Sequence, residues 1–227
     1  MRSLGTGEGA VAEVVAVIRT AIVSGRLAPG SEIALAELSE QLDVAMTTTR
    51  DALTRLADQR LVIESSDFQF RVAQASRAEL AELTELRQIV EGAAVRLSVE
   101  RGDSGWVQRV RESYSALAAV ERVSNRPGTQ EDWRAAHTAF HEALCADAHN
   151  ARLTALAAIL RDEAEIYRQL SDSASTPERR VEVAGEHRRL MELAVAGRGD
   201  EARDLLHTHL AGTRDAVIGS VWPDDRP

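Results

Sequence analysis

The stretch that decides the fold of the N-terminal part reads Leu35-Ala-Glu-Leu-Ser-Glu-Gln-Leu42, Asp43-Val-Ala-Met46, then Thr47-Thr-Thr-Arg-Asp-Ala-Leu-Thr-Arg-Leu56. Leucines at positions 35, 38 and 42 recur at the spacing of one helix face, and so do the apolar residues at 52, 53 and 56. Only the short break at 43–46 separates the two patterns. Two helices joined by so tight a turn are typical of a helix-turn-helix.

Elements on both sides of this pair extend the prediction. Before it, residues 11–23 carry a helical apolar stripe that ends in the turn 24–30, where Gly25 suits a helix C-cap. After it, β-like runs at 61–64 and 68–72 flank a short polar turn, which indicates a hairpin. A helix, a helix-turn-helix and a hairpin together predict a winged helix-turn-helix.

In that arrangement the second helix of the pair enters the major groove of DNA. We expect its first residues to be exposed and to contact DNA, because threonine hydroxyls reach phosphates or base edges and arginine pairs with guanine or phosphate. These residues are Thr47, Thr48, Thr49 and Arg50. The alternative is a small helical domain for protein contacts, whose arginines are merely solvated.

The rest of the chain carries helical patterns and no β-like run. A polar connection at 73–76 precedes them, and Asn150 and Thr176 predict helix starts as N-caps. The sequence therefore predicts a mostly α protein in two domains. These are a winged helix-turn-helix DNA-binding domain at 1–75 and an all-α, antiparallel six-helix bundle at 76–227.

Composition limits the class of protein. Aromatic residues make up only 4% of the 227 residues, so alanine, leucine, valine and isoleucine must build the core, which favours closely packed helices. All 27 basic residues are arginine, and the net charge of -9 argues against non-specific polyanion binding by the whole molecule. Residues 1–75 are themselves acidic, with seven arginines against ten aspartates and glutamates. A local DNA-binding face remains compatible with this balance.

The single cysteine and the hydropathy pattern bear on location. Cys145 lies on a helical pattern and is expected to be a small buried hydrophobe. One cysteine leaves no internal disulfide, which fits a reducing compartment. The first residues lack the apolar core of a signal peptide, and no apolar run reaches the roughly 18 residues of a membrane span. We expect a cytoplasmic protein with no membrane partner.

Four histidines form a candidate site. His137 and His141 stand four residues apart, which puts both imidazoles on one face of a helix. His187 and His209 lie on the apolar stripes of two further helical patterns. Imidazoles that point into a core from three helices can share one metal ion or one polar pocket. The alternative is that each histidine is hydrogen-bonded separately in the core.

Three segments of the N-terminal part resemble the GntR family of bacterial transcription regulators. They are Ile22-Val-Ser-Gly-Arg-Leu-Ala-Pro-Gly30, Leu38-Ser-Glu-Gln-Leu-Asp-Val44 and Thr49-Arg-Asp-Ala-Leu-Thr-Arg-Leu56. The resemblance implies a DNA-binding winged helix, and Thr47 and Arg50 match the family's motif. Three departures accompany it: Ala45-Met46 replaces a Ser-Arg pair with a base-contacting arginine, Asp43 replaces a glycine, and Phe68-Gln69 replaces the Arg-Gly tip of the wing.

The second part resembles the FCD ligand-binding domain of the FadR subgroup of that family. The resemblance implies an all-α domain that binds a small effector and, in many members, a divalent metal ion. The residues that carry it are Glu85-Leu-Arg-Gln-Ile-Val-Glu91, Ala139-Phe-His-Glu-Ala-Leu144, Glu186-His187 and His209-Leu210.

That subgroup holds its metal through an Asp-x-x-x-His pair and two later histidines. His141, His187 and His209 fall on the histidine positions, whereas His137 occupies the aspartate position. Two possibilities follow, a site of four histidines or a weakened site of three. Because neutral imidazoles leave the metal its full charge, we expect zinc or nickel rather than manganese or magnesium, and a small carboxylate as effector.

Three further residues have expected environments. The resemblance implies that Arg87, the arginine of the first-helix motif, faces the effector; the alternative is a surface salt bridge with Glu91, four residues further on. His149 and His207 lie off the inward stripes, so we expect both to be exposed.

The features together favour a transcription regulator that responds to a metabolite. A homodimer would place two winged domains on a palindromic operator in double-stranded DNA, because two-fold symmetry in the protein matches that of the site. One alternative, suggested by Met46 and the altered wing, is a sensor or partner-binding protein with lost or weakened specific DNA binding. Another is a metal-dependent hydrolase, in which three histidines leave one zinc position open.

Overall fold

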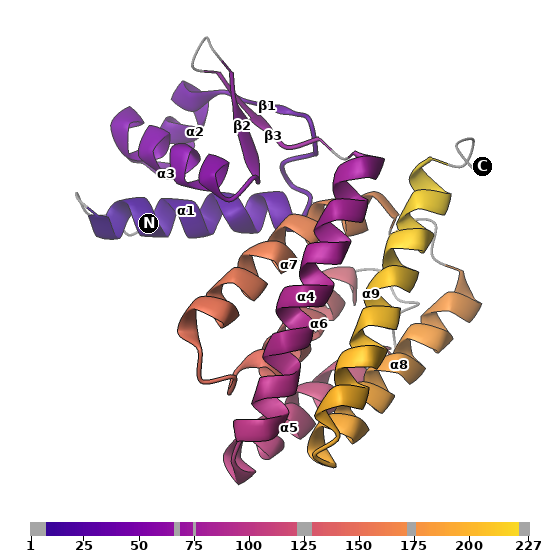
Figure 1. The fold of residues 1–227 in the computed structure, drawn as a ribbon. Coiled ribbons are helices and arrows are strands. Elements are labelled where there is room, and N and C mark those ends of the chain that lie inside the picture. Colours follow the sequence, from indigo (N-terminus) through magenta and orange to yellow (C-terminus); the bar gives the residue numbers. More distant parts are fainter. Residues whose placement is uncertain (1–7, 66–68, 75, 122–128, 172–175, 223–227) are drawn as a thin grey trace. The chain divides into compact units, whose positions relative to one another are not determined.

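The computed structural model describes residues 8–65, 69–74, 76–121, 129–171 and 176–222 (Figure 1). Their contacts group the chain into two compact units. The first consists of residues 1–76 with 162–169, and the second of 77–161 with 170–227. Within the described residues, no helix combines the length and the apolar character needed to cross a membrane.

The first unit is the predicted winged helix-turn-helix. Its apolar core is built from buried side chains that include Ile18, Leu53, Leu56 and Phe70, and the partly buried leucines at 35, 38 and 42 pack against it. Gly25 has a φ of 76°, which fits the predicted C-cap of the first helix. The described helices are α1 (Glu8–Val23), α2 (Leu35–Leu42) and α3 (Met46–Asp58), and the strands are β1 (Glu32–Ile33), β2 (Val62–Glu64) and β3 (Phe70–Val72).

The tight turn between α2 and α3 depends on Asp43. This residue adopts the left-handed conformation, with φ 55° and ψ 46°, which short polar side chains tolerate better than most. Its backbone N–H donates to the carbonyl of Glu40, and that of Val44 donates to Ser39. These bonds close α2, and extended backbone at Ala45 then starts α3. The aspartate thus fills the conformational role for which a glycine would be the usual choice.

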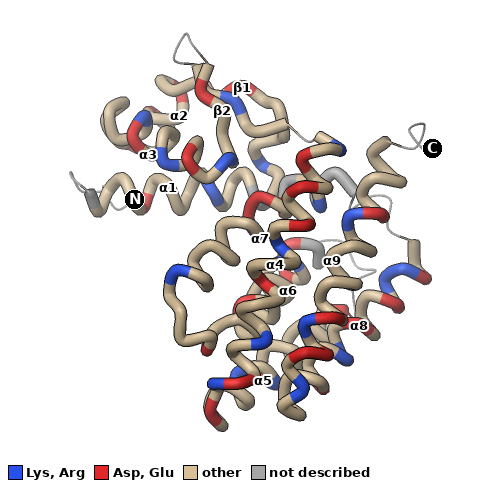
Figure 2. Tube along the Cα trace, in the orientation of Figure 1, with Lys and Arg blue, Asp and Glu red and all other residues tan. Residues whose placement is uncertain are grey.

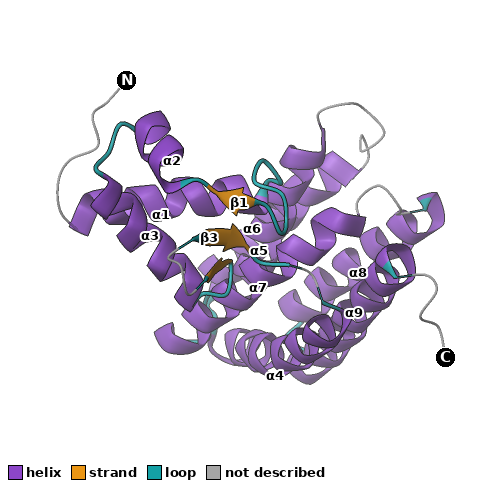
Figure 3. Ribbon diagram, turned by 90° about the horizontal axis from the view of Figure 1, so that it is seen from above, coloured by secondary structure: helices purple, strands orange, loops and turns teal. Residues whose placement is uncertain are grey.

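The wing is part of a three-stranded antiparallel sheet in the order β1-β3-β2 (Figure 3). The hairpin prediction is confirmed for β2 and β3, with Val62 opposite Val72. Residues 66 and 67 of the predicted turn 65–67, and residue 68 of the second predicted β run, lie outside the described residues. Strand β1 was not predicted, because two residues carry no readable alternation. It forms by pairing with β3, where Glu32 stands opposite Arg71 and binds it at 2.7 Å.

The second unit is all-α within its described residues, as predicted. Two predicted N-caps are confirmed: Asn150 Oδ1 accepts from the Leu153 N–H at 3.1 Å, and Thr176 Oγ1 accepts from the Arg179 N–H at 3.2 Å. Its described helices are α4 (Arg77–Arg101), α5 (Ser104–Glu121), α6 (Thr129–Cys145), α7 (Ala151–Ser171), α8 (Pro177–Val195) and α9 (Gly199–Val221).

Helices α4 and α9 lie side by side in this unit (Figure 1). They approach each other closely at Gly92, where an added Cβ would lie 2.4 Å from Nε2 of His207. His207 Nε2 lies 2.8 Å from the Gln88 carbonyl, and Gln88 Nε2 donates to the His207 carbonyl at 2.9 Å. The prediction that His207 is exposed was therefore wrong. The side chain is half-buried, because its polar ring finds a partner on the neighbouring helix.

Gly92→Ala should destabilise the protein by about 1–3 kcal/mol, because the methyl group would push His207 off Gln88. Urea unfolding followed by circular dichroism measures the change. Gly185→Ala is the matched control, since nothing lies within 4 Å of an added Cβ at that position of α8. It should stabilise the helix by up to about 1 kcal/mol. Equal effects of the two substitutions would contradict the close approach at Gly92.

Candidate metal centre and nucleic-acid interface

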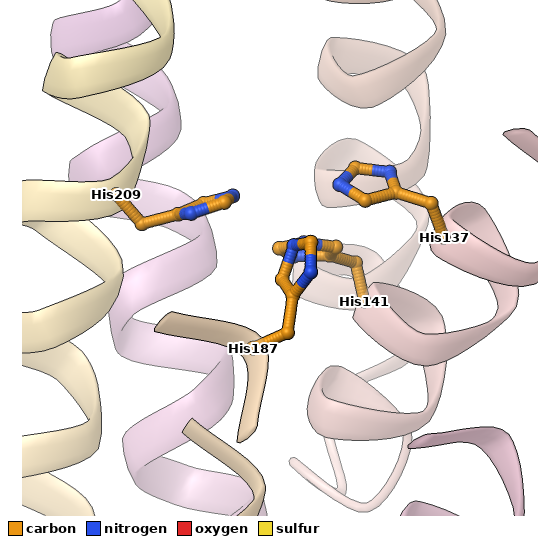
Figure 4. Close-up of side chains that lie close together, drawn as sticks. All are labelled: His137, His141, His187 and His209. Atoms are coloured by element: carbon orange, nitrogen blue, oxygen red, sulfur yellow. The ribbon is translucent and has the colours of Figure 1, made fainter. Parts of the chain in front are cut away.

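The four predicted histidines come together from three helices (Figure 4). His137 and His141 stand one turn apart on α6, His187 is on α8 and His209 on α9. Each offers a ring nitrogen, and these nitrogens all lie within 4.8 Å of one another. The rings of His137 and His187 are 5.0 Å apart between centroids, and those of His187 and His209 are 4.9 Å apart. Such a group could hold one metal ion.

Aromatic neighbours shape the cluster on the α6 side. The ring of Trp133 stacks on His137 with centroids 4.7 Å apart and an angle of 24° between the planes. Phe140 lies edge-on to both His141 and His187, at 5.6 Å and 5.7 Å. His141, His187 and Phe140 are buried, whereas His137 is half-buried. The inward orientation expected of the helical stripes is thus observed.

Two carboxylates contact the outer side of the cluster. Glu121 Oε1 lies 2.8 Å from Nδ1 of His187, and Glu186 Oε2 lies 2.6 Å from Nδ1 of His209. The second oxygen of Glu186 accepts from Arg179 Nη1 at 3.2 Å. Sequence reasoning missed both pairs, because partners 66 and 23 residues apart leave no local signal.

Two ring nitrogens of the cluster lack hydrogen-bond partners within the described protein. Nε2 of His141 and Nε2 of His187 are buried and accept or donate no hydrogen bond there. A buried polar nitrogen without a partner costs about 1–3 kcal/mol, so such atoms are uncommon in native cores. A metal ion bound between the rings would satisfy both nitrogens at once, and the residues present fit one.

The electrostatics keep the imidazoles in the form that binds metal. Burial lowers the pKa of His141 well below its usual value, and the neighbouring His209 and His187 add to that effect. Burial also lowers the pKa of His209 to about 4, although its hydrogen bond with Glu186 acts in the opposite direction. Both rings are therefore neutral near pH 7, with a lone pair available for a metal.

Arg87 does form the ion pair with Glu91 that was the alternative reading, but the pair is buried. Arg87 Nε lies 2.6 Å from Glu91 Oε1, and Arg161 Nη1 from α7 lies 3.3 Å from Oε2 of the same carboxylate. The Glu91 side chain is fully buried, with 0% exposed. The network brings two arginines into the interior, and their charges act on His141.

Cys145 is buried beside this network, as predicted. Its exposed fraction is 2%, and its Sγ lies 3.8 Å from Arg161 Nη1. Burial raises the pKa of the thiol to about 12, since the nearby arginine charge only partly offsets the loss of water. His149, by contrast, is exposed as expected.

The start of α3 is less exposed than predicted, at three of the four positions. Thr47 is exposed, and Thr48 and Arg50 are half-buried, but Thr49 is fully buried. Its hydroxyl is hydrogen-bonded at 2.9 Å to the hydroxyl of Ser39 on α2. The prediction that Thr49 is exposed and reads DNA was therefore wrong.

A signal for this burial was present in the sequence. Position 49 precedes positions 52, 53 and 56 at intervals of three, four and seven residues, so Thr49 belongs to the inward stripe of α3.

Met46, which begins the helix, has 51% of its surface exposed. Arginines and acidic residues are interspersed along the helices of this unit (Figure 2).

Comparison with known families and structures assigns both units. Residues 10–66 match the family described as bacterial regulatory proteins, gntR family, and residues 82–212 match the FCD domain. BphR of Paraburkholderia xenovorans (strain LB400), described as an uncharacterized HTH-type transcriptional regulator, is 32% identical over 202 residues, 88% of this chain and 82% of BphR. The HTH-type transcriptional repressor GlaR of Escherichia coli (strain K12) is 25% identical over 195 residues, 85% of this chain and 89% of GlaR.

Solved structures agree on the fold. McbR/YncC of E. coli superposes with a TM-score of 0.81 at 20% identity, covering 96% of this chain and 98% of that one. A transcriptional regulator from Rhodococcus sp. RHA1, described as a GntR protein, superposes with a TM-score of 0.76 at 24% identity, covering 92% and 98%.

Cys145 should resist alkylation in the folded protein. With a pKa of about 12, on the order of one thiol in ten thousand is ionised near pH 8, and the sulfur is also shielded from solvent. Iodoacetamide labelling followed by mass spectrometry should therefore modify the urea-unfolded chain and leave the native chain unmodified over the same time. Comparable rates in the two states would contradict the burial.

Proposed function

Since the chain belongs to the GntR family of bacterial transcription regulators and carries an FCD domain, we propose that a metal ion and a small carboxylate bound by its second part modulate operator binding by its first. The proposed division is a DNA-binding domain at 1–75 and an effector domain at 76–227. The relatives compared are transcription regulators, and the chain is one of them rather than an enzyme. A regulator of bacterial operators works in the cytoplasm.

The observation that carries the metal half of the proposal is the histidine cluster. Its ring nitrogens lie within 4.8 Å of one another, and two buried Nε2 atoms have no partner in the described protein. We infer that His137 acts as a fourth ligand with His141, His187 and His209, because its ring belongs to the same cluster. Imidazole donors favour borderline metals, so zinc or nickel is the expected ion.

A carboxylate is the proposed effector because of the charge at this site. Four neutral imidazoles leave the full charge of a divalent ion in place, and a carboxylate oxygen would both coordinate it and offset that charge. Arg87 lies close enough for its charge to act on His141 and His209. We infer that it helps to attract the anion while remaining bound to Glu91.

DNA binding is proposed for the start of α3. Thr47, Thr48 and Arg50 are the proposed contacts, and Thr49 is omitted because it is buried. A homodimer would present two such helices to a palindromic operator. The effector would change operator affinity only if it binds the DNA-competent arrangement and the alternative arrangement unequally.

A second candidate function is the sensing of metal and carboxylate with weakened specific DNA binding. Met46 is exposed at the position where the family pattern has a base-contacting arginine, and the N-terminal part is acidic. Loss of one bidentate arginine forfeits about 1–3 kcal/mol of discrimination between bases. The chain would then sense metal and carboxylate but bind DNA with weakened specificity, and could act through a protein partner.

The metal site predicts a stoichiometry. Protein dialysed against zinc or nickel and then against buffer should retain about one ion per chain by elemental analysis, and His187→Ala should retain close to none. His149→Ala is the matched control, because that histidine is exposed and lies outside the cluster. Circular dichroism verifies that each variant is folded. A wild-type stoichiometry near zero would remove the metal from the proposal.

The proposed DNA-binding function predicts that the protein binds specifically to the region upstream of its own gene. In fluorescence anisotropy at fixed salt, Arg50→Ala should weaken that complex about 10-fold or more, which corresponds to about 1–3 kcal/mol. Arg188→Ala removes the same charge from an exposed position on α8 and should leave binding unchanged. If the wild-type protein binds this DNA no better than a scrambled sequence, the second candidate is favoured.

A further inference from the structure

We propose that Glu121 and Glu186 are positioning residues, which hold His187 and His209 with Nε2 towards the metal and supply negative charge that the four coordinating imidazoles lack. This inference rests on the proposed metal site. It assigns a role to two carboxylates that do not themselves belong to the cluster of ligand atoms.

Glu186 contacts a histidine that lies on another helix. It directly precedes His187 in α8, yet its Oε2 lies 2.6 Å from Nδ1 of His209 on α9. Successive side chains on a helix point about 100° apart, so one segment of α8 can present a ligand and also support the ligand of its neighbour. Arg179 Nη1 binds the other oxygen of Glu186 at 3.2 Å and so fixes the carboxylate from its far side.

Glu121 does the same for His187. It is the last residue of α5, and its Oε1 lies 2.8 Å from Nδ1 of His187, whose side chain has 0% of its surface exposed. Each of the two histidines outside α6 therefore has its own carboxylate. The α6 pair has a different support, since Trp133 stacks on His137.

These contacts determine which ring nitrogen can bind a metal. An ionised carboxylate only accepts hydrogen bonds, so Nδ1 of each ring carries the hydrogen and Nε2 carries the lone pair. Nε2 of His187 is buried without a hydrogen-bond partner in the described protein, as expected for a nitrogen kept for a ligand. Carboxylate–histidine–metal triads hold both the tautomer and the ring direction in this way.

The same carboxylates balance charge. A divalent ion held by four neutral imidazoles would be a buried charge without compensation, and the nearby Glu91 is already bound to Arg87 and Arg161. Glu121 and Glu186 supply part of that compensation from just outside the ligands, and Glu186 shares its charge with Arg179. The negative charge that a coordinating aspartate would supply then lies beyond the imidazole rings, which leaves the ion itself free to attract an anionic effector.

Zinc affinity of the full-length protein tests the proposal through Glu121→Gln and Glu186→Gln, which keep the shape and remove the charge. Competition with a chromophoric chelator should give affinities about 10- to 100-fold weaker for each variant. Glu182→Gln is the control, because Glu182 binds the same Arg179 at 2.7 Å but contacts no histidine in the structure. Its zinc affinity should equal that of wild type. Thermal unfolding without metal should be similar for all three variants.

The tautomers give a second readout that a merely structural role would not produce. In metal-free protein with ¹⁵N-labelled histidine, long-range ¹H–¹⁵N spectra should show the hydrogen of His187 and His209 on Nδ1. Unchanged zinc affinity in both glutamine variants, or hydrogens on Nε2, would overturn the inference and leave the metal site standing. If wild-type protein binds no zinc, the metal site and the inference fall together.

Discussion

Each histidine in the core of the second unit takes two ring nitrogens out of water, and each nitrogen needs a partner there. Glu121 and Glu186 satisfy Nδ1 of His187 and His209 from outside the cluster, whereas Nε2 of His187 has no partner inside it among the described residues. A hydrogen bond at Nδ1 without one at Nε2, as in His187, distinguishes this cluster from core histidines that are each bonded separately. It is the physical basis of the proposed metal site, and it requires α5, α6, α8 and α9 to keep their positions.

Close helix packing makes that arrangement possible in a chain with few aromatic residues. The aromatic side chains that it has are concentrated around the site: Phe140 lies edge-on to two of the imidazoles and Trp133 stacks on a third. Behind α9, the absence of a side chain at Gly92 lets α4 approach, and the bonds between Gln88 and His207 join the two helices. These contacts hold α9 against α4 two residues before His209.

Carboxylates and arginines lie near the four imidazole rings. His141 and His209 are neutral because burial lowers the pKa of both, the carboxylates of Glu121 and Glu186 contact His187 and His209, and the buried Glu91 binds Arg87 and Arg161 nearby. Such a network is costly unless every charge has a partner. If an anion binds there as proposed, it would meet arginines already held in place by Glu91, which would lower the entropy lost on binding. This ordering favours a sensing role over an open catalytic site.

Local sequence patterns predicted most of the helices of this protein and the histidines of its candidate site. Helical periodicity placed the helices of both units and the inward histidines, and the caps at Asn150 and Thr176 were readable because a cap depends on residues within one turn. Tertiary structure decided the pairing of strand β1, the hydrogen bond between Thr49 and Ser39, and the carboxylates that contact the histidines. These features pair residues that only docking brings together, and the spacing of one helix does not encode which face of another it will meet. The sequence by itself therefore identified the four histidines of the cluster, and only the packed helices decided which residues contact them from outside.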